Sequence, residues 1–319
     1  MLKTGILLTN TGTPDAPTPK ALRRYLREFL SDRRIVQLPR SVWLPILYGL
    51  ILPLRPRRSA KLYKNIWSEH GSPMRHKMLN LAQDLSKRLQ IPVEVGMNYG
   101  NPSISAALEK FRENLIEKII VLPLFPQYSN TSSGSSFDRV LQAIEKKWQR
   151  WPELHLVREY ATANTYIQSL AASIESFWQS NGRGQHLLIS FHGIPERLVR
   201  AGDPYAMQCQ ETAQLLADEL ALRSDQWTLC YQSQFGYDRW LKPSTQALFG
   251  ELPARGIKHL DVVCPGFSFD CLETLEEIAI SGQESFHEAG GSDLRYIPCL
   301  NDSELQVNII TQLVNSPLT

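Results

Sequence analysis

Short apolar runs alternate along this chain with longer amphipathic stretches. The apolar runs have the length of β-strands and begin near residues 6, 93, 118, 187, 227 and 258. Between them, apolar residues recur at the three- and four-residue spacing of helices, for example at 77–89, 104–117, 137–149 and 207–222. Continuously apolar strands that alternate with helices predict an α/β protein with parallel sheets covered on both faces.

The second half of the chain repeats the pattern of the first. ILLTNTGTP at 6–14 aligns without a gap with LLISFHGIP at 187–195. A second pair, KIIVLPLFPQYS from Lys118 and KHLDVVCPGFSF from Lys258, aligns from its first residues. Any two strand–helix–strand units share some likeness, but the Gly-x-Pro that follows each opening strand favours a true duplication.

The duplication predicts two similar lobes, at residues 1–160 and 161–319, with a cleft between them. Ligands of open α/β sheets bind beyond the carboxyl ends of the strands, so we expect the loops after the strands to converge on this cleft. A last strand, LRYIPCLN, and a helix from about Ser303 either close the second lobe or cross back to the first.

Composition narrows the class of protein. No signal segment is visible, and the most apolar stretch, VWLPILYGLILPL at 42–54, is too short for a membrane span and contains two prolines. The five cysteines are scattered, without a C-x-x-C pair. They fit reduced thiols in a cytosolic protein and give no zinc or iron–sulfur signature.

The charge is unevenly distributed. Residues 1–64 contain 13 Lys and Arg against 3 Asp and Glu, a local charge of +10 in a chain whose net charge is +2. A basic segment beside an apolar run indicates an anionic, partly apolar partner. Nucleic acid is a weaker interpretation, because no binding motif accompanies the basic residues, and a plain solvated surface is the alternative.

His192 is the first candidate for chemistry. It stands at the expected carboxyl end of the strand that opens the second lobe, directly before the Gly-x-Pro turn. A neutral imidazole in this position can accept a proton or bind a metal ion of borderline softness. The alternative is a structural or solvated histidine.

Acidic residues crowd the segment SFDCLETLEEIAI at 268–280. Asp270, Glu273 and Glu277 are three and four residues apart, so we expect them to share one helical face. Acids at a helix start also stabilise its dipole, which is the simpler explanation for some of them. A file of carboxylates is instead typical of a path for cations or protons. With one histidine it would make a sparse, open site that suits a metal in transit.

Together, these segments resemble ferrochelatase, the enzyme family that inserts Fe²⁺ into a porphyrin to make haem. The resemblance covers nearly the whole chain, from LLTNTGTPDAP through HGSP, LPLFPQYSNTSSGSS, SFHGIPERLVRAGDPY and YQSQFGYDRWLKP to CPGFSFDCLETLEEI. It implies two Rossmann-like lobes around a porphyrin cleft. It also implies a lyase of haem and porphyrin biosynthesis that inserts Fe²⁺ into protoporphyrin IX and releases two protons.

The resemblance also assigns residues to the site. The family's catalytic and metal-contacting histidine and glutamate fall on His192 and Glu273, and Glu277 continues an acidic path for protons or metal along a helix with a π-type widening. Three residues match the family's porphyrin pocket: Tyr63, Gln232 and Trp240. Bending the flat ring would expose its nitrogens, and a base of near-neutral pKa such as His192 would then remove their protons.

Further expectations follow from the resemblance. We expect no permanently bound cofactor, since Fe²⁺ is the substrate, and a cytoplasmic monomer. Members with a [2Fe–2S] cluster use a cysteine-rich C-terminal extension and an upstream cysteine, whereas here Asn130 fills the upstream position and no cysteine follows Cys299, which predicts no cluster. Cys271 replaces a histidine of some members. The segment 42–58 is expected to form a lip of the cleft, and its contact with a membrane surface stays open.

Two alternatives differ from this interpretation. A related chelatase would act on another ring or metal, such as coproporphyrin or a cobalt-accepting precursor, and each extra ring carboxylate would need an extra basic contact. A non-catalytic haem or metal carrier on the same frame would bind porphyrin without turnover.

Overall fold

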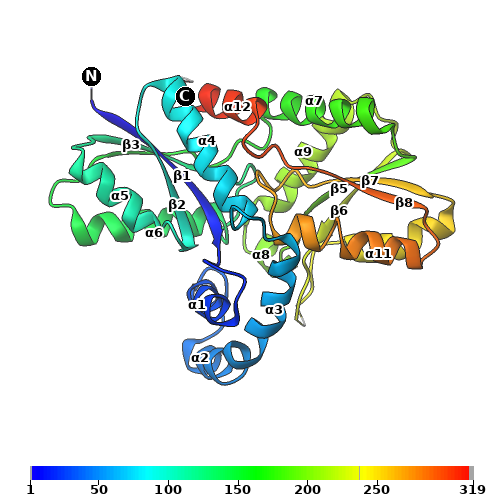
Figure 1. Cartoon of the computed structure of the whole chain (residues 1–319), viewed down its shortest axis with the longest axis horizontal. Coiled ribbons are helices and arrows are strands. Elements are labelled where there is room, and N and C mark those ends of the chain that lie inside the picture. Colours follow the sequence, from blue (N-terminus) through cyan, green and yellow to red (C-terminus); the bar gives the residue numbers. More distant parts are fainter. Residues whose placement is uncertain (1, 237, 316–319) are drawn as a thin grey trace. The chain divides into compact units, whose positions relative to one another are not determined.

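A computed structural model describes residues 2–236 and 238–315, and the chain divides into two compact units (Figure 1). Unit 1 comprises Met1–Phe125 and Ser129–Glu159, and unit 2 comprises Pro126–Tyr128 and Tyr160–Thr319. Each unit contains one four-stranded parallel sheet, which confirms the predicted α/β class with two similar lobes. The functional domain boundary at residue 160 and the shared cleft stay predictions.

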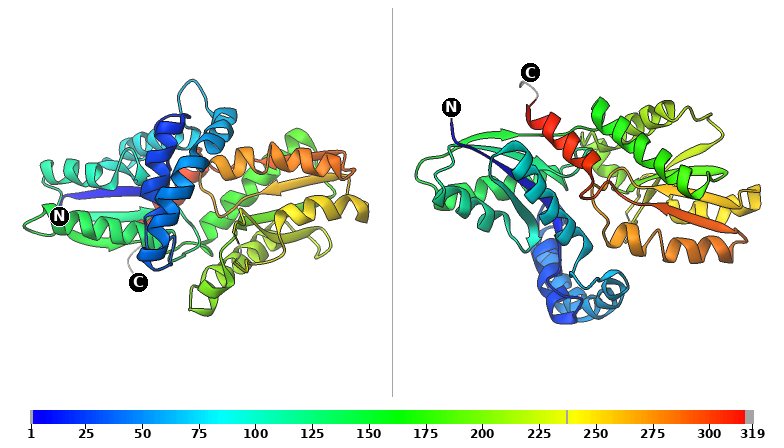
Figure 2. Two further views of the ribbon diagram at one scale, coloured as in Figure 1. Left: turned by 90° about the horizontal axis from the view of Figure 1, so that it is seen from below. Right: turned by 45° about the horizontal axis from the view of Figure 1, so that its top comes forward.

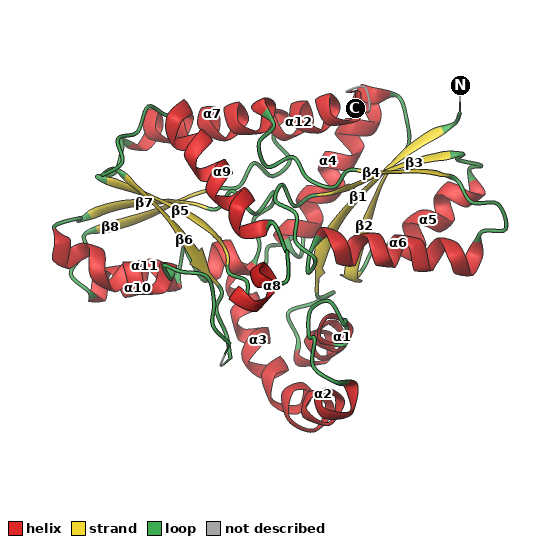
Figure 3. Cartoon of the chain, turned by 180° about the vertical axis from the view of Figure 1, so that it is seen from behind, coloured by secondary structure: helices red, strands yellow, loops and turns green. Residues whose placement is uncertain are grey.

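The sheet of unit 1 has the strand order β2-β1-β3-β4. Its strands are β1 (Thr4–Thr13), β2 (Val93–Gly100), β3 (Lys118–Pro123) and β4 (Glu153–Leu156). The helices that pack against it include α4 (Pro73–Leu89), α5 (Ile104–Glu113) and α6 (Ser133–Lys147). In Figure 3, α4 lies on one face of this sheet, whereas α5 and α6 lie side by side on the other. This arrangement buries both faces, so the central strands are continuously apolar.

The sheet of unit 2 has the equivalent strand order β6-β5-β7-β8. Its strands are β5 (His186–His192), β6 (Trp227–Gln232), β7 (His259–Val263) and β8 (Asp293–Ile297). The helices are α7 (Asn164–Asn181), α8 (Glu196–Arg200), α9 (Tyr205–Glu219), α10 (Thr245–Glu251) with the 3₁₀ turn η2 (Leu252–Arg255), α11 (Ser281–Glu288) and α12 (Glu304–Asn315). Helix α12 begins where a last helix is predicted, and it packs against α7 of the same unit.

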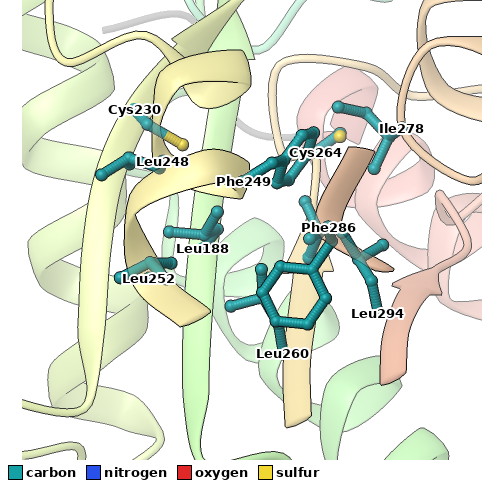
Figure 4. Packing of buried hydrophobic residues seen from close by; sticks show 11 residues of the cluster. Leu188, Cys230, Leu248, Phe249, Leu252, Leu260, Cys264, Ile278, Phe286 and Leu294 are labelled. Atoms are coloured by element: carbon teal, nitrogen blue, oxygen red, sulfur yellow. The ribbon is translucent and has the colours of Figure 1, made fainter. Parts of the chain in front are cut away.

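The cores of the two units are built from equivalent residues. In unit 1, Leu7, Ile119 and Val121 belong to the cluster under α5 and α6. In unit 2, the positions Leu188, Leu260 and Val262 belong to the cluster under α10 and α11, most of which Figure 4 labels. Matching strands therefore present matching faces to matching helices, which supports the duplication.

The predicted alignment of the third strands is wrong by one residue. In unit 1, Ile6 pairs with Ile120, whereas in unit 2 the equivalent Leu187 pairs with Asp261. Lys118 therefore corresponds to His259 and not to Lys258. A shift of one residue would exchange the two faces of a strand, so the buried pattern and not the shared lysine fixes the register.

The units differ most between their first two strands. Unit 1 inserts α1 (Pro19–Leu30), α2 (Arg40–Ile46), the π-helical segment η1 (Leu47–Ile51) and α3 (Leu52–Ile66), which follow one another as a single excursion (Figure 2). This excursion contains the predicted lip. Six large apolar residues on it are more than a third exposed: Leu38, Val42, Ile46, Tyr48, Leu50 and Leu54. Within the described residues, no helix is long and apolar enough to cross a membrane.

The other predicted helices are present with shifted ends. The helix predicted at 104–117 stops at Glu113, because Leu115 adopts a left-handed conformation with φ 55°. The short edge strand β4 was not predicted, since its four residues are only partly buried and lack a strong apolar run.

Candidate active site

His192 is the last residue of β5, as its sequence position predicts. Its side chain is half-buried, and Nδ1 lies 2.6 Å from the main-chain oxygen of Gly193. A carbonyl oxygen can only accept, so Nδ1 carries the proton in this contact. The neutral ring therefore keeps its lone pair on Nε2, where it can accept a proton or bind a metal ion.

The turn after His192 requires glycine. A Cβ on Gly193 would lie 2.9 Å from the main-chain oxygen of Gln232 and 3.2 Å from the Trp240 ring. The equivalent Gly12 of unit 1 is tighter still, with φ +103° and a Cβ position 2.0 Å from the oxygen of Tyr99. In both repeats the glycine lets the end of the first strand pass close to its neighbour, which explains the shared Gly-x-Pro.

The acidic segment begins as the π-helical turn η3 (Leu272–Glu276). Its hydrogen bonds span five residues, from Glu277 N to Leu272 O at 3.2 Å and from Ala279 N to Thr274 O at 3.1 Å. Cys271 caps the turn, and its own N–H donates to Thr274 Oγ1 at 3.0 Å. The predicted π-type widening is therefore present at the segment that carries Glu273.

The carboxylate of Glu277 is held by Ser233, which lies in the loop directly after β6. Ser233 donates to it twice, through its N–H to Oε1 at 2.7 Å and through its hydroxyl to Oε2 at 2.5 Å. Burial raises the pKa of Glu277 above its ordinary value of 4.5. The Ser233 hydrogen bonds and the nearby His192 oppose this rise, and the charge of Glu273 adds to it. His192, Glu273 and Glu277 therefore interact electrostatically within unit 2.

Gln232 connects the segments that carry these residues. It pairs with His192 in the register of β5 and β6 and is 2 % exposed. Its Nε2 donates to the main-chain oxygen of Glu273 at 2.6 Å, and its Oε1 accepts from Ser190 Oγ at 2.8 Å and from Cys264 Sγ at 3.3 Å. The side chain predicted to line the porphyrin pocket is thus buried among protein partners.

Asp270 does not belong to the acidic file, so the prediction that it shares a face with Glu273 is wrong. Asp270 precedes η3 and is 4 % exposed. Its carboxylate accepts from Tyr296 OH at 2.7 Å, Cys299 N at 3.1 Å and Asn301 Nδ2 at 2.8 Å. It therefore anchors the loop after β8 to the start of the π turn.

The two aromatic residues assigned to the pocket lie in different units. Tyr63 is in α3 of unit 1, buried, with its ring edge-on to Trp67 at 6.2 Å. Trp240 is in unit 2, where its indole N–H donates to Phe235 O at 3.0 Å and its ring lies 4.9 Å from that of Phe235. Their role in substrate binding stays a prediction.

Sequence reasoning missed Ser233. Nothing in the sequence marks this serine, but its left-handed backbone, with φ 61°, aims both of its donors at Glu277. Among residues 2–236 and 238–315, no group of three or more His, Cys, Asp or Glu could hold a metal ion. The arrangement offers one imidazole lone pair and two carboxylates, which suits proton transfer and brief contact with a metal ion.

Comparison with known proteins gives the family. The family model for ferrochelatase matches residues 3–318. The ferrochelatase of Methylococcus capsulatus is 51% identical over 317 residues, which cover 98% of this chain and 96% of the relative. The ferrochelatase of Vibrio atlanticus is 47% identical over 312 residues, which cover 98% and 97%.

Solved structures share the fold. SirB from Bacillus subtilis with Fe³⁺ superposes with a TM-score of 0.58 at 11% identity, over 98% of this chain and 96% of the other. The sirohydrochlorin chelatase SirB from B. subtilis subspecies spizizenii, in complex with cobalt, gives 0.56 at 10% identity, over 98% and 93%. These likenesses concern the two-lobed fold, whereas the full-length identity to curated relatives shows that the chain belongs to the ferrochelatase family.

Proposed function

We propose that this chain uses His192, Glu273 and Glu277 to carry out its family's activity, the insertion of Fe²⁺ into protoporphyrin IX. As a ferrochelatase it is a lyase of haem biosynthesis, and iron is its substrate. One observation carries the assignment of residues. The imidazole comes from the end of β5 and both carboxylates come from the acidic segment at 268–280, and the two segments are joined through Gln232 and Ser233.

The proposed roles follow from the needs of the reaction. Fe²⁺ replaces two N–H protons of the ring, so the protein must accept protons as the metal enters. The Nε2 lone pair of His192 suits the acceptance of one of these protons. Glu273 is partly exposed and suits contact with the incoming hydrated ion. Glu277, whose pKa is raised, exchanges a proton at a higher pH than an ordinary glutamate, which suits passage of protons away from the ring.

Tyr63 and Trp240 are proposed to contact the macrocycle. The resemblance to the family and the large flat faces of the two rings support this assignment. Gln232, matched to the same pocket, is proposed to act through Glu273 instead, because both ends of its amide bind protein atoms.

We propose that the enzyme works without an iron–sulfur cluster. At the upstream cluster position Asn130 offers an amide and no thiolate, and its oxygen accepts a hydrogen bond from Arg34. The five cysteines are free thiols, four of them buried. The monomeric state, the cytoplasmic location and the division into two functional domains near residue 160 are proposed by analogy with the family.

We also propose that the excursion from α1 to α3 contacts a membrane surface. Its exposed apolar residues, among them Leu50 at 56% and Leu54 at 64%, lie in the segment of net charge +10. Apolar side chains beside basic ones suit a surface of anionic lipid.

An anaerobic insertion assay tests the function. The native chain is incubated with Fe²⁺ or Zn²⁺ and either protoporphyrin IX or coproporphyrin, and porphyrin fluorescence is followed. We expect turnover that is faster with protoporphyrin IX. Faster turnover of coproporphyrin would assign a different ring, and porphyrin binding without turnover would indicate a carrier.

A further inference from the structure

We propose that Gln232 and Ser233 form a two-point clamp that positions the acidic π turn for metal insertion. This inference deepens the proposed function and rests on it. The two residues are consecutive at the end of β6, and each binds one of the two glutamates of the site. Gln232 binds the main chain of Glu273, and Ser233 binds the carboxylate of Glu277.

The clamp holds the π turn at two points. Helical turns whose hydrogen bonds span five residues are rare and mostly single, and they occur frequently at functional sites. Here the main-chain oxygen of Glu273 is fixed at 2.6 Å from Gln232 Nε2. Four residues later, both carboxylate oxygens of Glu277 are fixed by Ser233. The clamp thereby sets the spacing and orientation of the two acids.

The clamp is itself anchored to the strand that carries His192. Gln232 accepts from Ser190 Oγ at 2.8 Å, and its main-chain oxygen accepts from Gly193 N at 2.8 Å. Ser190 Oγ lies 2.8 Å from Thr245 Oγ1, so the network extends to the first turn of α10. Since these groups are buried and satisfied, they resist displacement. The same buried hydrogen-bond network therefore fixes the position of the histidine relative to the two glutamates.

Gln232 and Ser233 are therefore positioning residues, and they differ from residues that bind porphyrin. A positioning role predicts slower insertion at saturating substrate, with porphyrin affinity retained. A direct contact with porphyrin predicts weaker porphyrin binding, with the rate at saturation retained. The structure favours the first, because the polar atoms of Gln232 are directed at protein groups.

The test compares Gln232→Met and Ser233→Ala with two matched controls. Gln208→Met removes another buried glutamine of unit 2, whose Oε1 accepts from Tyr128 N at 2.7 Å. Ser281→Ala removes another serine that donates to a glutamate, Glu276, at 3.2 Å. For each variant, kcat and the KM for Zn²⁺ are measured with saturating porphyrin, the porphyrin Kd by fluorescence, and the thermal midpoint by calorimetry.

We expect Gln232→Met to lower kcat/KM for the metal by about 10- to 100-fold, the range for residues that orient metal-contacting groups. Ser233→Ala should lower it by about tenfold, since the Ser233 N–H remains. Porphyrin Kd should stay unchanged in both, and the controls should keep native kinetics. An unchanged metal kcat/KM, a weakened porphyrin Kd as the main effect, or equal losses in the controls would overturn the clamp.

A second measurement separates this proposal from the proposed function. Zn²⁺ binding is titrated calorimetrically without porphyrin, in the native chain and in Gln232→Met. If the native chain inserts no metal, the proposed function fails, yet weaker Zn²⁺ binding by Gln232→Met would still support the clamp. Equal Zn²⁺ affinities together with equal insertion rates would contradict the clamp while leaving the function in place.

Discussion

Gly193 shows how one residue shapes the site. Its missing side chain lets the main chain after His192 pass within hydrogen-bonding distance of Gln232, with Gly193 N donating to Gln232 O at 2.8 Å. The Trp240 ring also lies close to the space that a side chain at position 193 would fill. Because backbone atoms cannot move aside as a flexible side chain can, this position tolerates no Cβ without a local shift.

We predict that Gly193→Ala costs about 1–3 kcal/mol of unfolding free energy, as overpacking does. Activity should fall with it, because His192 is displaced. The matched control is Gly250→Ala in α10, where a Cβ would meet nothing within 4 Å. This control should be stabilised by about 0.5–1 kcal/mol through its helix propensity. Urea unfolding measures both, and equal stabilities of the two variants would contradict the account.

Asp32 gives a pH-dependent prediction in unit 1. Burial works to raise its pKa, but hydrogen bonds from Arg34 N, Ser135 and Tyr99, together with the charge of Arg139, outweigh burial and hold the pKa below its ordinary value of 3.8. A carboxyl with a lowered pKa stabilises the folded chain at pH values above its ordinary pKa of 3.8. This stabilisation is lost as the pH falls through the pKa of the folded state.

Asp32→Asn should therefore cost about 1–3 kcal/mol at pH 7, the range for a hydrogen-bonded charge. The difference from the native chain should shrink as the pH falls below 3.8, where the native carboxyl becomes protonated. Thermal unfolding between pH 7 and pH 3 measures this difference. A stability difference between Asp32→Asn and the native chain that stays constant from pH 7 to pH 3 would contradict a stabilising charge on Asp32.

At the scale of elements, the excursion α1–α3 sets unit 1 apart from unit 2. In the same place unit 2 has only the short α8 before α9. The inserted helices bury residues such as Trp43, Leu47 and Leu52 and leave Leu50 and Leu54 exposed. An apolar surface of this kind is costly in water unless a partner covers it.

We predict that the native chain sediments with vesicles of anionic lipid and not with neutral ones. Leu50→Asp and Leu54→Asp should each weaken this binding by about tenfold or more, because each loses the burial of one leucine. Leu115→Asp, at a leucine that is 77% exposed outside the excursion, is the control and should bind as the native chain does. Binding that is insensitive to both lip substitutions would contradict the proposed membrane contact.

The sequence predicts this fold well because its strands are buried on both faces. The apolar runs around Leu7 and Leu188 locate the strands, and the Gly-x-Pro after each aligns the two halves. Sequence reasoning failed where contacts join distant segments. Asp270 looks like part of an acidic file, but its partner Asn301 lies 31 residues away. Spacing along the chain reveals no such contact.

The site illustrates the same limit. The strand end at His192 was predicted from a local pattern, whereas the π turn was predicted from the resemblance to the family. The two donors of Ser233 were not, because they depend on a left-handed backbone at φ 61° that only the folded chain displays. The sequence therefore points to the groups proposed to carry the chemistry, and the structure was needed to find which residues hold them.

For the whole molecule, the central claim is that an imidazole and a carboxylate of unit 2 perform the family's reaction. The most direct measurement is the anaerobic rate of Zn²⁺ and Fe²⁺ insertion by the native chain, His192→Ala and Glu273→Gln. Glu276→Gln is the control, since Glu276 lies in the same turn and contacts Ser281. Porphyrin affinity and circular dichroism verify that each variant is folded.

We predict that His192→Ala and Glu273→Gln each lose about 10²- to 10⁴-fold in rate, the usual contribution of a positioned acid or base, while they still bind porphyrin. The Glu276→Gln control should insert metal at the native rate. Insertion at the native rate by either His192→Ala or Glu273→Gln would contradict the account.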